Sequence, residues 1–331
     1  MNTLTPARQQ RGAALLVALL IAALVSITLS MMLARQSALA GIEWQLRETA
    51  QARRILQGAE DWALLILRED ARRSAMDHLG EPWAIPLQEG RLADFLKSSG
   101  ESNSYAAELA NSRVQDVWLS GRIRDAQARY NLMRLATSGA TQAPERALWL
   151  RVAAQAELPA DLARTVAARF APPPVAKETT RDTPTPTHQP PLSLAHLIAQ
   201  MPALAPWADA LSALVVVLPE ATPINVNTAS QPVLMALLPA LDEKLAARFI
   251  EQRAKAPWRD LAAVSAAFPE TPLGVDATQA AVASRYFTIS AHVRLGAEPA
   301  SATEASATTL VERLPQENRT RVVRRDNGAA L

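Results

Sequence analysis

The hydrophobic pattern of the chain begins with an uncharged apolar run over residues 13–34, which ends at Arg35. As an α-helix, this run is roughly 33 Å long, which matches the bilayer core of about 30 Å. It contains no ionised side chain, and a helix satisfies its own backbone hydrogen bonds in lipid. We therefore predict that residues 13–35 form the membrane-spanning part of an N-terminal helix.

Two arginines, Arg8 and Arg11, precede the apolar run. Basic residues beside a span favour the cytoplasmic side, so the rest of the chain is expected outside the cytoplasm. A secretory signal peptide is a poorer interpretation, because its apolar region has only about 7–15 residues. A plain uncleaved membrane anchor fits the segment as well and remains an alternative.

The apolar pattern does not end at the predicted membrane surface. After Arg35 no proline occurs until Pro82, and apolar residues recur at spacings of three and four among charged ones. This periodicity predicts an amphipathic helix with one apolar stripe. A continuous helix from Ala13 to about Arg73 would be roughly 90 Å long. On its second half, Trp44 and Trp62 are expected to pack against a sheet.

Alternating apolar and polar residues predict strands on both sides of a long middle region. Residues 114–123 and 285–295 alternate in this way, and residues 308–314 and 320–325 are typical of a hairpin. A region rich in loops, at about residues 79–104, separates the first of these strands from the long helix. The flanking strands predict one antiparallel sheet.

The middle region has helical patterns arranged in pairs around prolines. The predicted helices are residues 145–155 with 160–170, 192–200 with 207–214, and 231–238 with 243–254. Residues 171–191 hold seven prolines and are expected to form an exposed linker. The predicted fold class is α+β: a long N-terminal hydrophobic helix packed on an antiparallel sheet, with a large inserted α-helical domain.

Composition agrees with a folded exported domain. The 331 residues are 49% hydrophobic, which is enough for a sizeable core. The absence of cysteine excludes disulfides, thiolate chemistry and cysteine metal sites. A formal net charge of +2, from 34 basic and 32 acidic residues, gives no indication of a polyanionic partner.

No pattern in the sequence indicates catalysis, so the chain is predicted not to be an enzyme. It has no Gly-x-Ser-x-Gly elbow and no glycine-rich phosphate loop with its lysine. The four histidines lack metal-ligand spacing. Neighbouring acidic residues are interpreted as helix starts, at Asp242 and Glu243, or as solvated helix-face residues, at Glu60 and Asp61.

Three features, in this order along the chain, resemble the type IV pilin-like superfamily and, within it, minor pseudopilin K of the type II secretion system. The first is a basic leader that ends in Gly12 before an apolar helix. The second is the segment 125–135, which matches the family's Asp-x-x-x-Arg-Phe-Asn-Leu pattern with Tyr130 in place of phenylalanine. The third is the strand Val215–Pro219 followed by the Ile-Asn-Val-Asn-Thr-Ala stretch from Ile224.

The resemblance implies processing by a dedicated prepilin peptidase between Gly12 and Ala13, with Ala13 as the residue that is methylated. Most members carry a glutamate five residues after the cut, where this chain has Val17. That glutamate pairs with the terminal amine of a neighbouring subunit during assembly. A subunit without it suits the end of a filament.

The resemblance also implies an architecture and a place in the cell. Residues 1–12 would be a leader, and residues 13–35 would be a transmembrane helix. A pilin-like domain would consist of residues 36–130 and 285–331, and the α-domain inserted between these two parts would be residues 131–284. The protein would be a single-pass protein of the cell inner membrane, with most of the chain in the periplasm. It would form the tip of the periplasmic pseudopilus in protein export. Its partners would be the I, J and H minor pseudopilins, the prepilin peptidase and the inner-membrane secretion platform.

The family's calcium site is not expected here, and no cofactor or metal site is predicted. In the family, an acidic segment between the first helical pairs contributes carboxylates to calcium. The corresponding linker has only Glu178 and Asp182 as acidic residues, and calcium needs about six to eight oxygen ligands.

A membrane-anchored helix-hairpin-helix protein that binds DNA for uptake is the main rival function, and a plain anchored periplasmic scaffold is another. A helix-hairpin-helix module needs a Gly-Ile-Gly turn, so that its backbone can contact a phosphate. This chain has Ala240-Leu241-Asp242 at the corresponding position. Capping explains the preceding motif, because Thr228 and Gln231 have the spacing of a capping box. We therefore expect no nucleic-acid partner.

Overall fold

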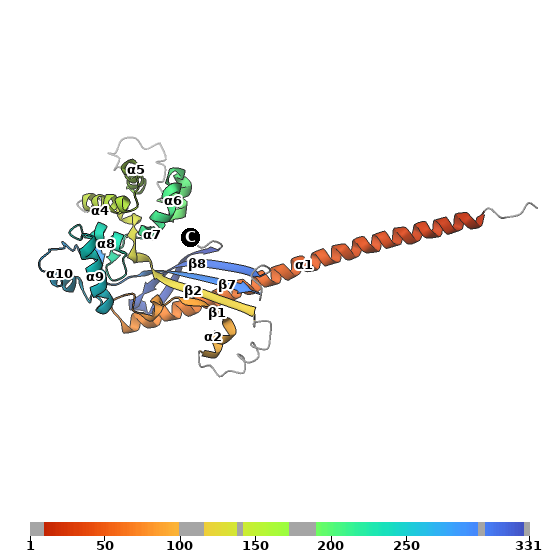
Figure 1. Cartoon of the computed structure of the whole chain (residues 1–331), viewed down its shortest axis with the longest axis horizontal. Coiled ribbons are helices and arrows are strands. Elements are labelled where there is room, and N and C mark those ends of the chain that lie inside the picture. Colours follow the sequence, from red (N-terminus) through yellow and green to blue (C-terminus); the bar gives the residue numbers. More distant parts are fainter. Residues whose placement is uncertain (1–9, 99–115, 138–141, 172–189, 297–301, 328–331) are drawn as a thin grey trace, which may run out of the picture.

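The computed structural model describes residues 10–98, 116–137, 142–171, 190–296 and 302–327. Its first element, α1 (Gln10–Arg73), is a single 64-residue helix that extends far beyond the rest of the protein (Figure 1). The predicted long helix is therefore confirmed. The segment Leu15–Gln36 is long and apolar enough to cross a membrane, and none of it is buried in the protein.

Five strands form one antiparallel sheet in the order β1-β2-β7-β8-β9. Their bounds are β1 (Leu87–Arg91), β2 (Val117–Asp125), β7 (Tyr286–Leu295), β8 (Thr303–Leu314) and β9 (Arg319–Asn327). The last four match the predicted strands. β1, with the helix α2 (Leu92–Ser98) and the short 3₁₀ helix η1 (Pro82–Ala84), lies in the region predicted to be rich in loops.

The second half of α1 packs on one face of this sheet. Ala52, Leu56, Ala63 and Leu67 are buried at spacings of four and seven, which places them on one side of the helix. Alternate residues of β2, β7 and β8 face α1 and form two apolar clusters with it. These strand residues are Val117, Leu119, Phe287, Ile289, Val293 and Val311. The helix is thus both the predicted membrane segment and a core element of the folded body.

Three predictions about side chains of α1 are wrong. Trp44 is 51% exposed and does not belong to the sheet core. Trp62 is 44% exposed and packs edge-on against Phe95 of α2. Glu60, predicted to be solvated, is buried, because Arg325 on β9 donates to both of its carboxylate oxygens, at 2.7 and 2.9 Å.

Helices occupy the chain between β2 and β7. The α-helices are α4 (Gln142–Gln155), α5 (Ala160–Phe170), α6 (Leu194–Gln200), α7 (Ala208–Leu214), α8 (Gln231–Leu237), α9 (Glu243–Lys255) and α10 (Leu261–Ala266). The 3₁₀ helices are η3 (Ala126–Ala128), η4 (Leu132–Ala136) and η6 (Pro202–Trp207), and η8 (Pro315–Glu317) joins β8 to β9. The six predicted helices are present, whereas α10 was not predicted.

Two short parallel pairings tie distant parts of this helical block together. β3 (Tyr130–Asn131) pairs with β4 (Val215–Val216), and β5 (Ile224–Asn225) pairs with β6 (Ala280–Ala281). The block has a large apolar core of its own, which includes Trp149, Phe170 and Phe249. Residues 172–189 of the predicted proline-rich linker lie outside the described residues.

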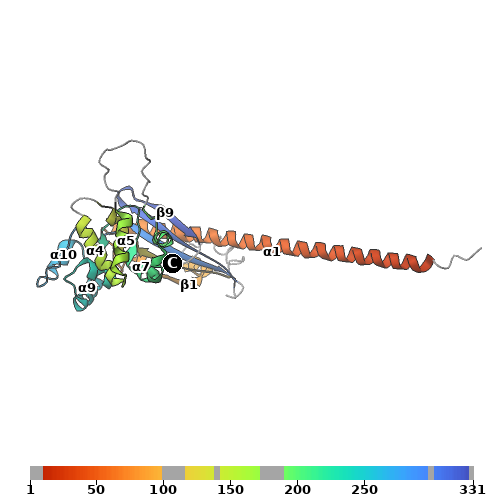
Figure 2. The same ribbon diagram turned by 90° about the horizontal axis from the view of Figure 1, so that it is seen from above.

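The helical block lies at the end of the sheet that is remote from the apolar segment of α1. Both views agree on this arrangement (Figures 1 and 2). β2 and β7 are neighbours in the sheet, so the chain leaves the sheet after Asp125 and returns to it at Tyr286. The mixed α+β fold is as predicted.

Candidate functional site

The two sequence motifs of the helical region meet at Asp125, the last residue of β2. This carboxylate accepts four hydrogen bonds. Oδ1 accepts from the Gln127 N–H at 2.7 Å, and Oδ2 accepts from Asn225, Thr228 and Ser284 at 2.6–2.9 Å. Asp125 is buried, and charge-assisted hydrogen bonds of this kind are among the strongest in proteins. The contact joins the end of the sheet to the helical block.

Asn225 is the centre of this junction. Its Nδ2 donates to the backbone carbonyl of Asp77 and to Ser284 Oγ, both at 3.0 Å, as well as to Asp125. Its Oδ1 accepts from the Asn227 N–H at 2.9 Å. The side chain is fully buried, so each of these groups needs a partner, and each has one.

The predicted capping box is wrong. α8 begins at Gln231 with Ser230 as its N-cap residue, and no side chain caps the helix. Thr228 lies two residues before the N-cap, and its hydroxyl donates to Asp125 Oδ2 at 2.6 Å instead. Gln231 makes a long contact of 3.5 Å from Nε2 to the carbonyl of Glu243. The spacing is that of a capping box, but the carboxylate supplied by β2 binds the hydroxyl.

The remaining polar residues of the motif hold the helical hairpin that follows. Asn227 accepts from the Trp258 N–H and donates to the Trp258 carbonyl, both at 2.9 Å. Arg253 of α9 is buried and donates to the carbonyls of Val226 and Ala229. Burial lowers the pKa of Arg253 to about 10. The motif thus supports α9 and the segment after it.

A second buried cluster adjoins the first through Ser284. Arg313 of β8 donates from Nη1 to Asp70 at 2.8 Å and from Nη2 to Asp77 at 2.5 Å. The same Nη2 donates to the Ser284 carbonyl at 3.0 Å, and Asp77 Oδ2 accepts from the Ser284 N–H at 2.6 Å. The guanidinium of Arg313 therefore joins three parts of the chain: the end of α1, the segment that leads into β7, and β8 itself.

The acidic groups of this cluster outnumber its cation. Burial is the main cause that raises the pKa of Asp70 to about 6 and of Asp77 to about 7, and Arg313 opposes the rise. Burial also raises the pKa of Asp125. Two carboxylates that share one guanidinium in a desolvated site favour a bound proton near neutral pH.

Asp70, Asp77 and Glu81 could together hold a metal ion by their geometry, since one oxygen of each lies within 4.8 Å of the others. The observed donors do not fit a cation, because Arg313 already supplies the positive charge to Asp70 and Asp77. Glu81 Oε2 accepts from Trp83 Nε1 at 2.7 Å and from the His78 N–H at 3.0 Å. The segment that corresponds to the family's calcium ligands falls largely on residues 172–189, outside the described part of the chain.

The residues predicted for processing lie at the other end of the molecule. Gly12 and Ala13 are within the first turns of α1, and their side chains lie outside the described residues. Val17 is 55% exposed on the apolar segment. None of these residues approaches the junction around Asp125.

Sequence reasoning identified Asp125 and the Asn225–Thr228 stretch, but not their partners Asp70, Asp77, Ser284 and Arg313. The two hydroxyl groups of the cluster, those of Ser284 and Thr228, both donate to Asp125 Oδ2 and are buried with it. Its polar groups are buried and almost all hydrogen-bonded, the exception being Arg313 Nε, and this is the arrangement of a structural joint. What the geometry can do is fix the helical block rigidly on the sheet.

The fold and this joint define the class: an α+β protein whose N-terminal apolar helix continues onto an antiparallel sheet and whose helical block interrupts that sheet. Residues 224–285, which include the Asn225 motif, match the family model of the type II secretion system (T2SS), protein K. No curated protein matches the chain.

Among solved structures, the chain is similar to one in "The Crystal Structure of the GspK-GspI-GspJ complex from enterotoxigenic Escherichia coli Type 2 Secretion System". The TM-score is 0.62 and the identity is 21%, over 86% of this chain and 98% of that chain. These two findings confirm the predicted resemblance to the type II secretion minor pseudopilin K.

Proposed function

We propose that this chain is a minor pseudopilin of the K type, which forms the tip of a periplasmic pseudopilus and takes part in protein export across the outer membrane. The observation that carries the proposal is the architecture of α1. One helix is exposed and apolar over Leu15–Gln36 and then becomes the core helix of the folded body. Subunits that assemble through packed N-terminal helices need this arrangement.

The position of the helical block supports a place at the tip. The block lies at the end of the sheet remote from the apolar segment, where it widens the body (Figure 1). A subunit with such a block would obstruct subunits stacked beyond it. Val17 in place of the usual glutamate agrees with this place, because no further subunit would need to pair there.

The proposal includes membrane location and processing. The protein would sit in the inner membrane as a single-pass protein with its body in the periplasm, and the prepilin peptidase would cut between Gly12 and Ala13 and methylate Ala13. Its partners would be the I, J and H minor pseudopilins and the inner-membrane secretion platform. The role is structural assembly without a cofactor, and the joint around Asp125 is its supporting framework.

The DNA-binding alternative gains no support from the helical pair α8 and α9. The side chain of Asp242 caps α9, where Oδ1 accepts from the Leu245 N–H at 2.7 Å. A carboxylate thus occupies the turn at which a phosphate would have to bind, and it would repel that phosphate. We propose that nucleic acid is not a partner.

N-terminal sequencing of the mature protein tests the proposal. The chain isolated from cells is expected to begin at Ala13, and the variant Gly12→Ala is expected to keep its leader. Gly58→Ala is a matched control in the same helix, since a Cβ at Gly58 meets nothing within 4 Å. A mature chain that keeps residues 1–12 would instead indicate a plain anchored scaffold.

A further inference from the structure

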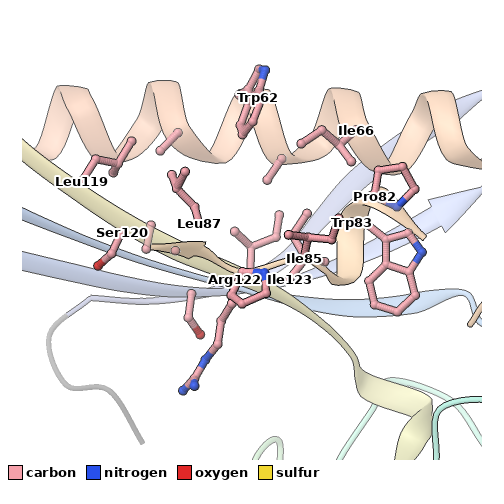
Figure 3. A pocket seen from close by; sticks show the side chains of 17 residues that line it. Trp62, Ile66, Pro82, Trp83, Ile85, Leu87, Leu119, Ser120, Arg122 and Ile123 are labelled. Carbon is pink, nitrogen blue, oxygen red and sulfur yellow. The ribbon is translucent and has the colours of Figure 1, made fainter. Parts of the chain in front are cut away.

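Three arginines gather where β2 leaves the sheet. Arg122 and Arg124 are two residues apart on β2, and Arg129 follows η3. Side chains two apart on a strand share a face, and the Arg122 side chain extends to the side of the sheet away from α1 (Figure 3). Arg124 therefore lies on this same open face, next to the helical block.

A pocket of about 340 Å³ opens between the sheet and the helical block at this point. Arg124 and Arg129 line it, together with Ser212 of α7 and Ser230 before α8. Its outer wall includes Leu79, which is 57% exposed. Arginine is enriched at protein–protein interfaces relative to the rest of the protein surface.

Among the residues that line this pocket, the buried Asp125 is the one carboxylate that opposes the positive charge of the arginines. The ion pairs of the described residues include none formed by Arg122, Arg124 or Arg129. Arg129 donates from Nη1 to the carbonyl of Ser212 at 3.0 Å. Asp125 also lines the pocket, but its oxygens already accept four other hydrogen bonds.

The three guanidinium groups also disfavour one another. Burial and the charge of Arg122 lower the pKa of Arg124. Burial and the charge of Arg124 lower the pKa of Arg129, and the charge of Asp125 opposes this fall. Three like charges held together beside a single buried carboxylate raise the free energy of the isolated chain. An external anion would remove that penalty, and a planar carboxylate fits the paired donors of arginine.

We propose that Arg122, Arg124 and Arg129 form a receptor for an acidic segment of a neighbouring minor pseudopilin, with one carboxylate of that segment bound in the pocket between Arg124 and Arg129. This inference rests on the proposed function, which supplies the neighbouring subunit. Charge complementarity selects the acidic segment, and the exposed Leu79 at the rim provides apolar contact beside it.

The test uses the full-length chain in detergent and the I- and J-type minor pseudopilins purified with it, and measures their dissociation constant. Arg124→Glu is expected to weaken association at least about tenfold, since it replaces attraction of the carboxylate by repulsion. Arg124→Lys, which keeps the charge, is expected to weaken it less. Arg248→Glu, at an exposed arginine of α9 outside the pocket, is the control and is expected to leave association unchanged.

The unfolding temperature of the isolated chain separates docking from a role in its own fold. Arg124→Glu relieves repulsion, so the unfolding temperature is expected to stay the same or rise. A clear fall would mean that the chain itself supplies the anion, which overturns the inference. Association of Arg124→Glu as tight as that of the unaltered chain also overturns it. If the unaltered chain binds neither pseudopilin, the proposed function fails and this inference fails with it.

Discussion

The side-chain amide of Asn225 donates to the carboxylate of Asp125 at 2.9 Å, although 100 residues separate them in the chain. Both groups are buried, and the amide has two further acceptors in the same cluster. The contact makes the helical block and the sheet interdependent, because neither side can satisfy its polar groups alone. It is the basis of the first prediction.

Asn225→Ala is expected to lower the free energy of unfolding by about 2–4 kcal/mol, because it leaves buried acceptors and the Asn227 N–H without a partner. Urea denaturation followed by tryptophan fluorescence measures the change. Thr228→Val is expected to cost about 1–2 kcal/mol for the lost bond to Asp125, whereas Gln231→Ala is expected to cost less than about 0.5 kcal/mol. Equal losses at residues 228 and 231 would favour the capping box and contradict the observed contact.

Arg313→Met is expected to destabilise the protein by about 3–5 kcal/mol at pH 8, because it leaves Asp70 and Asp77 buried without their cation. The loss should be smaller at pH 5, where both carboxyl groups are largely protonated. Arg319→Met is the control, since Arg319 pairs with Glu317 in solvent and is expected to change stability by less than about 0.5 kcal/mol. A pH-independent loss at Arg313 would mean that the charge of the two carboxylates is not the cause.

The pH dependence of stability follows from the raised pKa values of Asp70, about 6, and Asp77, about 7. The folded state holds these protons more tightly than the unfolded state, whose aspartates titrate near 3.8. Their contribution is therefore fully present below pH 3.8 and is lost as the pH rises to about 7. Each group lowers the free energy of unfolding by at most about 1.4 kcal/mol per pH unit in this window.

Urea denaturation at intervals from pH 4 to pH 8 checks this expectation. Glu81 and His78 also face the cluster, so Asp77→Asn is the informative comparison. The variant is expected to show a shallower fall of stability between pH 4 and pH 7 than the unaltered chain. An identical slope in the two proteins would exclude Asp77 as a titrating group.

Leu67→Ala is expected to destabilise the protein by about 2–5 kcal/mol, because Leu67 is fully buried between α1 and the sheet. Leu65→Ala, two residues away on the same helix, is the matched control. Leu65 is 54% exposed, and its truncation is expected to cost less than about 0.5 kcal/mol. Equal effects of the two substitutions in thermal unfolding would mean that the helix packs through another face.

The sequence was sufficient for elements whose pattern is local and regular. The periodicity from Ala13 to Arg73 predicted α1, and alternation predicted β2, β7, β8 and β9. β1 was not predicted, because its five residues, Leu-Gln-Glu-Gly-Arg, show no alternation of buried and exposed positions. They form a strand through backbone pairing with β2. Local patterns therefore predict helices and long strands better than short edge strands.

The candidate site was predictable only in part, because its partners are distant in the sequence. Glu60 and Asp70 have the spacing of solvated charges on a helix, yet arginines more than 240 residues later bury and pair them. Thr228 has the local spacing of a cap, yet Asp125 binds it. A single sequence does not show which pairs of distant charged residues will form ion pairs. These pairs depend on how the strands are arranged in the folded sheet.

The uninterrupted length of α1 has a mechanical consequence. No break in the helix separates the part that would lie in lipid from the part that packs on the sheet. The distance between these two parts is therefore fixed. A displacement of the apolar segment along the helix axis would therefore move the folded body by the same distance. The helical block at the far end of the sheet would move with it as a rigid unit.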